Sequence, residues 1–284
     1  MDNTYFIGEV FSKVNRNGKI LFSSLKGGVG KSTAACAVAM AFAEAGFNTV
    51  IVDLDFRSRS LDLIFGVSDR ALYTFDDYLN ERCSADEVLI PIEHDSTRKK
   101  NSEKTFSLRL CPACTEASFT DENLYKMIPT ALNKLALESG ADYIICDTGA
   151  DSRVPYIVAD GFSEVALIVA EQSRTSIRAA DATAEKLSEC HTTHDVRLLI
   201  NNFDIDAVRR MGRAGIIEMI DACRVRCIGV IPHDPHLAAF QDKGCLPDSS
   251  SSVSAAAANI AGRLRGIQTP LFDGMKKQRR KAVL

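Results

Sequence analysis

Residues 19–33 place the strongest constraint on the fold of this 284-residue chain. They read Lys-Ile-Leu-Phe-Ser-Ser-Leu-Lys-Gly-Gly-Val-Gly-Lys-Ser-Thr: an apolar run, a glycine-rich loop and a helical pattern that begins near Ser32. Glycines let the backbone N–H groups of such a loop point at an anion, and the helix start adds further unpaired N–H groups. The sequence therefore predicts a strand, a phosphate-binding loop and a helix, in that order.

The loop supplies candidate ligands for a nucleotide. Lys31 is placed to reach the β- and γ-phosphates, and the Ser32 hydroxyl to bind Mg²⁺. The general P-loop pattern has a glycine where this chain has Leu25, and a second lysine, Lys26, directly precedes the glycines. The predicted cofactor-binding residues of the loop are Gly27, Gly28, Val29, Gly30, Lys31, Ser32 and Thr33.

Two further apolar strands, at 49–53 and 143–147, end in acidic residues. Asp53 and Asp55 follow the first, and in a doubly wound sheet such a strand end faces the phosphate loop. These carboxylates could polarise water and organise Mg²⁺, or they could simply cap the turn. Asp147 ends the second strand, which resembles a Walker B strand whose acid holds Mg²⁺ through water.

The alternation of strands and helices predicts an α/β fold, a single doubly wound, mostly parallel sheet flanked by helices. We expect an ATPase domain at 18–268, an N-terminal extension at 1–17 and a basic tail at 269–284. An exposed loop is expected at 93–105. Further strands are expected at 107–112, 164–171, 196–202 and 227–232, and helices at 34–45, 71–92, 121–138, 173–188 and 253–266. Residues 57–65 are expected to form a switch-like loop and a short helix.

Composition narrows the functional classes. The net charge of −3 gives no overall attraction to nucleic acid or anionic membranes, so such contacts would need a local patch. No run of about 18 apolar residues is present, and the N-terminus lacks the apolar region of a signal peptide.

The chain has nine cysteines, an odd number, which suits a reduced, cytoplasmic chain. Cys111 and Cys114 have metal-binding or redox spacing, but without a second such pair a structural role is favoured.

Two motifs resemble those of a known family. The first is the loop at 26–31, where a lysine precedes the glycines, and the second is Val-Asp-Leu-Asp at 52–55 followed by Ser-Leu-Asp-Leu-Ile-Phe-Gly at 60–66. Over about residues 19–266 the chain resembles the MinD/ParA family of deviant Walker A ATPases. Within that family, 61–66 and 229–232 look most like MinD proteins, membrane-cycling regulators of division-site placement.

This resemblance implies an ATP- and Mg²⁺-dependent homodimer with slow intrinsic turnover, stimulated by an unidentified activating protein. Lys26 of each protomer would reach the phosphates bound by the other, as an arginine finger does. Asp55 would orient water, Asn201 would read adenine, and the loop from Pro232 would close over the base. The implied catalytic residues are Lys26, Lys31 and Asp55, and the implied metal site is Ser32, Asp53 and Asp147.

Several alternatives stay open. A ParA-type partitioning ATPase needs a basic DNA-binding surface, which makes nucleic acid the less favoured partner. A second alternative is an iron–sulfur electron carrier, which needs cysteines in glycine-rich loops. A third is a scaffold that binds ATP without hydrolysing it, which would not need Asp55, Asp147 and both lysines.

In the tail, five of the six residues from Lys276 to Lys281 are basic. This tail could contact an anionic membrane, giving a peripheral location on the inner face of the cell membrane, or it could be solvated.

Overall fold

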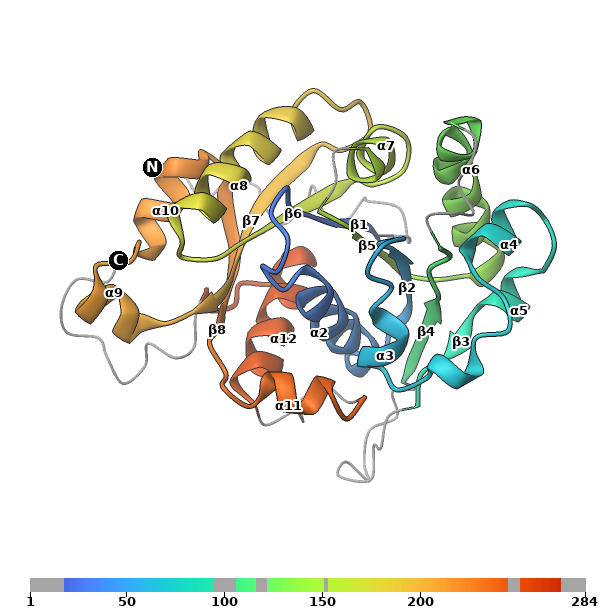
Figure 1. The fold of residues 1–284 in the computed structure, drawn as a ribbon, viewed down its shortest axis with the longest axis horizontal. Helices are drawn as coiled ribbons and strands as arrows, with labels where there is room; N and C mark the ends of the chain where they lie inside the picture. Colours follow the sequence, from blue (N-terminus) through green and yellow to red (C-terminus); the bar gives the residue numbers. More distant parts are fainter. Residues whose placement is uncertain (1–17, 94–105, 116–121, 151–152, 245–250, 272–284) are drawn as a thin grey trace, which may run out of the picture.

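The computed structural model describes residues 18–93, 106–115, 122–150, 153–244 and 251–271. Its centre is an eight-stranded sheet with the order β3-β4-β2-β5-β1-β6-β7-β8 (Figure 1). β3 runs antiparallel to β4, and every other neighbouring pair is parallel. The strands are β1 (Gly18–Ser23), β2 (Asn48–Leu54), β3 (Ile90–Pro91), β4 (Ser107–Cys111), β5 (Tyr143–Thr148), β6 (Val165–Ala170), β7 (Asp195–Phe203) and β8 (Arg226–Pro232).

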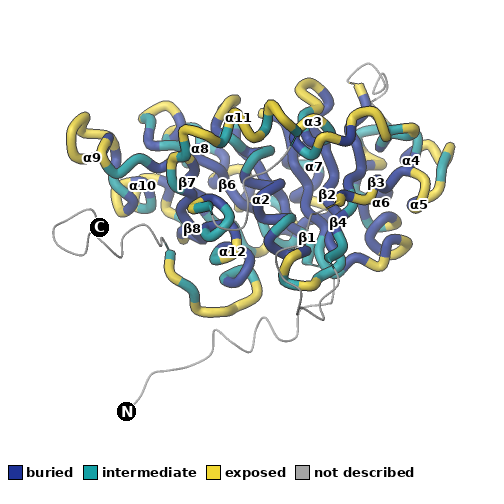
Figure 2. Tube along the Cα trace, turned by 90° about the horizontal axis from the view of Figure 1, so that it is seen from below, coloured by how far each residue is buried: buried dark blue, intermediate teal, exposed yellow. Residues whose placement is uncertain are grey.

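Helices cover both faces of the sheet, which leaves the strands as a buried middle layer (Figure 2). One face packs on α2, α3 and α12, and the other on α4 to α8 and α10. Burial on both faces explains why the strands are apolar without alternation. The helices are α2 (Lys31–Glu44), α3 (Leu61–Ile64), η1 (Ser68–Arg70), α4 (Phe75–Leu79), α5 (Ala85–Val88), α6 (Glu122–Ser139), α7 (Val154–Gly161), α8 (Arg174–Leu187), α9 (Ile205–Met211), α10 (Ile216–Cys223), α11 (Leu237–Gln241) and α12 (Ser252–Leu264).

The predicted fold class is confirmed, with one local error. The helix predicted at 71–92 is wrong: this stretch forms α4, α5 and the short strand β3. Glu81 adopts a left-handed φ of 58° directly after α4, which stops the helix. The Glu87 carboxylate then accepts the backbone N–H of Ser84 at 2.8 Å and starts α5 separately. Acidic helix-forming residues hid this break in the sequence.

Several sequence predictions concern residues outside the described part of the chain. These are the extension at 1–17, the loop at 93–105 apart from residue 93, and the tail from residue 272 onward. No helix in the described ranges combines the length and apolar character needed to cross a membrane.

Candidate nucleotide-binding site

The glycine-rich loop connects β1 to α2 at the carboxyl end of the sheet. Gly28 and Gly30 have φ values of 73° and 79°, in the left-handed region that favours glycine. A Cβ on Gly30 would also collide with the side-chain nitrogen of Asn201. Lys31 is the first residue of α2, a 14-residue helix, so the loop ends at unpaired helix N–H groups. The seven predicted residues are therefore contiguous, with Gly27 to Gly30 in the loop and the other three in the first turn of α2. Their contact with a nucleotide stays a prediction.

Distant segments hold this loop in place. Asn201, at the end of β7, is buried and donates from Nδ2 to the Val29 carbonyl at 2.8 Å. The Leu25 N–H donates to the hydroxyl of Thr183 on α8 at 3.4 Å. At the start of α2, the side chain of Gln241 on α11 donates to the Thr33 hydroxyl at 2.5 Å. Since Asn201 is bonded to the loop here, its role in reading adenine stays a prediction.

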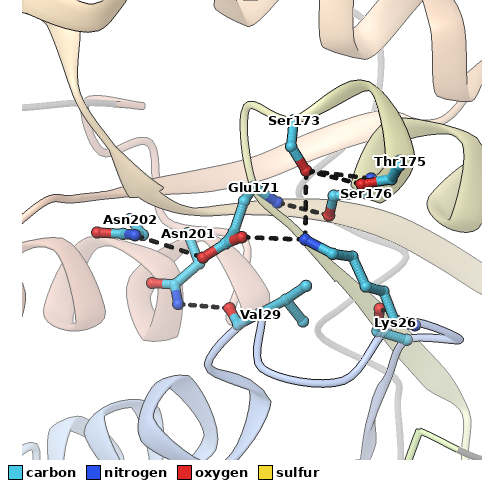
Figure 3. A network of polar contacts seen from close by, with 9 residues as sticks. Lys26, Val29, Glu171, Ser173, Thr175, Ser176, Asn201 and Asn202 are labelled. Atoms are coloured by element: carbon cyan, nitrogen blue, oxygen red, sulfur yellow. Dashed lines mark hydrogen bonds and ion pairs between the residues drawn. The ribbon is translucent and has the colours of Figure 1, made fainter.

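Lys26 lies outside the loop's phosphate-facing turn and points toward the end of β6 (Figure 3). Its Nζ is 3.4 Å from Glu171 Oε2 and donates to Ser173 Oγ at 3.2 Å. Asn202 donates to the other oxygen of Glu171 at 3.3 Å. The Lys26 and Glu171 side chains are 31% and 22% exposed, so the ion pair contributes about 1 kcal/mol or less and is easily exchanged.

The sequence interpretation did not assign Glu171, Ser173 or Asn202 to the site. Their positions in the sequence could have identified them. Glu171 and Ser173 come just after β6, and Asn202 lies at the carboxyl end of β7. Polar residues at the carboxyl ends of parallel strands gather at the binding edge of such a sheet.

The two carboxylates at the carboxyl end of β2 accept hydrogen bonds from the backbone. Asp53 accepts the N–H of Asp55 at 3.0 Å on Oδ1 and that of Leu61 at 3.1 Å on Oδ2. Asp55 Oδ1 accepts the N–H groups of Arg57 and Ser58 at 3.2 and 3.0 Å. Both acids therefore cap the turn that leads to α3. Their predicted roles toward Mg²⁺ and water stay predictions that must coexist with this structural role.

Asp147 differs from these two acids. It is fully buried, pairs in register with Asp53, and neither of its carboxylate oxygens has a hydrogen-bond partner among the described residues. Burial raises its pKa to about 7, although Ser32 and Lys31 act to lower it. A buried carboxylate beside the Ser32 hydroxyl and the Lys31 ammonium group fits a cation that also binds phosphate.

The other ligands of such a cation would have to be hydroxyl, water and phosphate oxygens. Among the described residues, no three His, Cys, Asp or Glu side chains are arranged to hold a metal. This donor set suits Mg²⁺, which keeps several waters and binds through one or two carboxylates and the substrate's phosphates. The structure thus brings all three predicted metal residues, Ser32, Asp53 and Asp147, into one neighbourhood. Of the two acids, only Asp147 has both carboxylate oxygens without a hydrogen bond to a described residue.

Asp147 predicts a pH-dependent stability of the nucleotide-free protein. Its folded pKa of about 7 exceeds the unfolded value of about 3.9, so the folded state binds the extra proton between these values. Stability should then fall as pH rises from about 4 to about 7, lowering Tm by on the order of 5 °C. Scanning calorimetry of Asp147→Asn should show a flatter pH profile than the natural protein. Parallel profiles for the two proteins would contradict this assignment.

The loop after β8 lies beside the end of β7. Pro232 is in register with Phe203, and the His233 N–H donates to the Phe203 carbonyl at 2.9 Å. The His233 ring is 2.7 Å from Asn202 Oδ1, so this loop is joined to the Glu171 network. Pro232 therefore stands at the same sheet edge as the phosphate loop. Its contact with the nucleotide base stays a prediction.

The Cys111–Cys114 pair is part of the core. Both thiols are buried, and burial raises the pKa of Cys114 to about 12 and that of Cys111 well above its usual value. Thiols in this state are poor nucleophiles and poor metal ligands. The pair therefore packs the face of the sheet that carries α4 and α6.

Comparison with known proteins shows the family of this chain. The family model for the CobQ/CobB/MinD/ParA nucleotide binding domain matches residues 20–246. The chain is 31% identical over 257 residues to a MinD-named septum site-determining protein of Oltmannsiellopsis viridis, covering 89% of this chain and 77% of that protein. It is 28% identical over 265 residues to the septum site-determining protein MinD of Synechocystis sp., covering 91% and 93%.

Two solved structures show the same architecture. The MinC:MinD cell division protein complex of Aquifex aeolicus has a TM-score of 0.77 at 25% identity, covering 89% of this chain and 98% of that one. MinD of Pyrococcus horikoshii complexed with Mg-ADP has a TM-score of 0.70 at 19% identity, covering 87% and 96%, which shows the fold alone. The loop geometry and the matched family model lead to one conclusion: the chain belongs to the MinD/ParA family of nucleotide-binding P-loop proteins.

Proposed function

We propose that this protein is an ATP-driven dimerising ATPase of the MinD type, acting in the spatial regulation of cell division or of another membrane or polar assembly. The position of Lys26 carries the proposal. Among the residues that the structure describes, its ammonium group contacts only Glu171 and Ser173, outside the turn that would hold the phosphates. A cation in that position is available to a nucleotide bound by a second protomer.

The chain's own residues divide the work of such a switch. The loop N–H groups and Lys31 would hold the phosphates, and Ser32 and Asp147 would hold Mg²⁺, which neutralises phosphate charge when bound. Asp55 would orient the attacking water. Lys26 would leave Glu171 for the partner's phosphates, exchanging an ion pair of about 1 kcal/mol or less for a charge-assisted contact in a closed interface.

The relatives support the regulatory part of the proposal. Two similar proteins with coverage above two thirds are named for septum-site determination, and one solved relative is a complex with MinC. Other proteins with the same fold are named for plasmid partition. We propose that the homodimer of this chain engages a protein that stimulates hydrolysis. The alternative is a ParA-type ATPase that partitions DNA or another cargo, which shares the family and the same site chemistry.

Sedimentation with vesicles separates these functions. With MgATP, the full chain should sediment with vesicles containing phosphatidylglycerol, and with MgADP it should stay largely in solution. Deleting residues 272–284 should remove most of this binding, because two basic tails on one dimer add through effective concentration. The deletion retains Leu271, whose carbonyl accepts the Val230 N–H at 3.3 Å. Equal sedimentation with both nucleotides would count against the membrane switch, and ATP-dependent retention on double-stranded DNA alone would favour partitioning.

A further inference from the structure

Five exposed arginines lie around the start of α8 and the end of α9. We call them the α8–α9 arginine surface: Arg174, Arg178, Arg209, Arg210 and Arg213. None of them makes an ion pair with a described residue within 4.0 Å, whereas the neighbouring Arg224 is paired with Asp181 at 2.9 Å. In a chain of net charge −3, this is a local concentration of uncompensated positive charge.

Hydrogen bonds from one residue bring the parts of this surface together. Gln172, two residues before α8, donates to the Ala214 carbonyl at 3.1 Å. Its side-chain oxygen accepts the N–H of Asp204, the residue before α9, at 2.8 Å. Because Arg174 is two residues from Gln172 and Arg213 is next to Ala214, these arginines belong to one surface.

Fold stability does not explain the arginines at the start of α8. Arg174 and Arg178 lie in the first turns of this helix, where a positive charge opposes the helix dipole, and no acid is present in that first turn. Arg209 and Arg210 do lie in the last turn of α9, where cations are favourable. Asp204 is the N-cap of α9, and Asp206 lies one turn before Arg210, but no ion pair within 4.0 Å joins Asp206 to these arginines.

Exposed apolar side chains stand among these arginines. Met211 is 72% exposed and ends α9, directly before Gly212, which turns the chain with a φ of 61°. Ile217, at the start of α10, is 45% exposed. A protruding methionine between arginines suits the boundary between lipid headgroups and acyl chains, whereas it gives no advantage in contact with a phosphodiester backbone.

The chain also leaves the described structure beside this surface. Leu271 bonds to β8, the edge strand next to β7, and β7 leads directly into α9. Thirteen residues follow Leu271, enough to reach about 43 Å when extended, and five of them are the basic residues between 276 and 281. A membrane that binds this tail would therefore come within reach of α9.

We infer that the α8–α9 arginine surface is a second contact with anionic phospholipid, which orients the ATP-bound protein on the bilayer held by its tail. The inference rests on the proposed membrane-switch function. Arginine forks pair with lipid phosphates, and Met211 enters the headgroup boundary beside them. The arginine surface fixes which side of the molecule faces the lipid, which a tail alone would not do.

The test compares two full-length triple variants that each remove three positive charges. Arg209→Gln, Arg210→Gln and Arg213→Gln alter the proposed surface. Lys126→Gln and Lys134→Gln remove exposed charges from α6, and Arg70→Gln removes one from η1, which pairs with Glu93 just after β3. α6 and β3 lie at the other end of the sheet from α9 (Figure 1). With MgATP and vesicles containing phosphatidylglycerol, the first variant should bind about tenfold more weakly and the control within about twofold of the natural protein.

Light scattering in MgATP keeps this inference separable from the proposed function. If both variants dimerise and both bind vesicles as the natural protein does, the arginine contact is wrong and the switch survives. If the natural protein does not dimerise with ATP, the proposed function fails first. A loss of binding to double-stranded DNA, with vesicle binding unchanged in the arginine variant, would assign the surface to nucleic acid and overturn the inference.

Discussion

Replacing Lys26 with alanine is expected to lower ATP turnover by at least about 100-fold while ATP affinity changes only a few-fold. A cation supplied by a second protomer contributes about 10³- to 10⁵-fold in related phosphoryl transfers. The loop that binds the nucleotide within one chain keeps its N–H groups and Lys31, so binding should survive. Steady-state hydrolysis and fluorescent-nucleotide titration measure the two quantities separately.

Lys134→Ala is the matched control for this variant. Lys134 is also a lysine paired with a glutamate, Glu81, at 3.0 Å, but it lies on α6, away from the loop. Its loss should leave turnover unchanged. A Lys26→Ala protein with normal turnover would show that this lysine has no role in the partner's site.

The Asp55→Asn variant is expected to bind ATP normally, to hydrolyse it about 100- to 1,000-fold more slowly, and to remain dimeric. Asparagine keeps an oxygen for the N–H groups of Arg57 and Ser58, so the turn after β2 is preserved while the negative charge that orients water is lost. Gel filtration in MgATP, with the dimer followed over time, measures its lifetime.

The two buried acids should give different defects. Asp147→Ala removes the carboxylate whose oxygens have no hydrogen-bond partner among the described residues, and it should weaken Mg²⁺-dependent nucleotide binding, whereas Asp55→Asn should not. Normal hydrolysis by Asp55→Asn would mean that another group orients the water. Equal defects in binding for both variants would contradict the division of roles.

Local patterns were sufficient to predict most of the fold. The strands at 49–53 and 143–147 are continuous apolar runs because both faces are covered, and the loop at 26–31 has the glycines that its left-handed turns require. The helix predicted at 71–92 failed because its break depends on a left-handed Glu81, a conformation that the composition of the segment does not indicate. α7 and α9 were not predicted either.

The site was predictable only in part, because its supporting contacts join residues far apart in the chain. Asn201 and Val29 are separated by 172 positions, and Lys26 and Glu171 by 145. The sequence interpretation placed Asn201 at the nucleotide edge but not in contact with the loop. It identified Lys26 but not Glu171, which pairs with it, since an ion pair between residues that follow distant strands leaves no local pattern.

The molar mass of the full-length chain in solution tests the central claim most directly. Multi-angle light scattering should give a monomer near 31.0 kDa with MgADP and twice that mass with MgATP. The Lys26→Ala protein should remain near the monomer mass with both nucleotides. An unchanged mass with MgATP, or a dimer that forms equally well without Lys26, would contradict an ATP-driven switch built on this lysine.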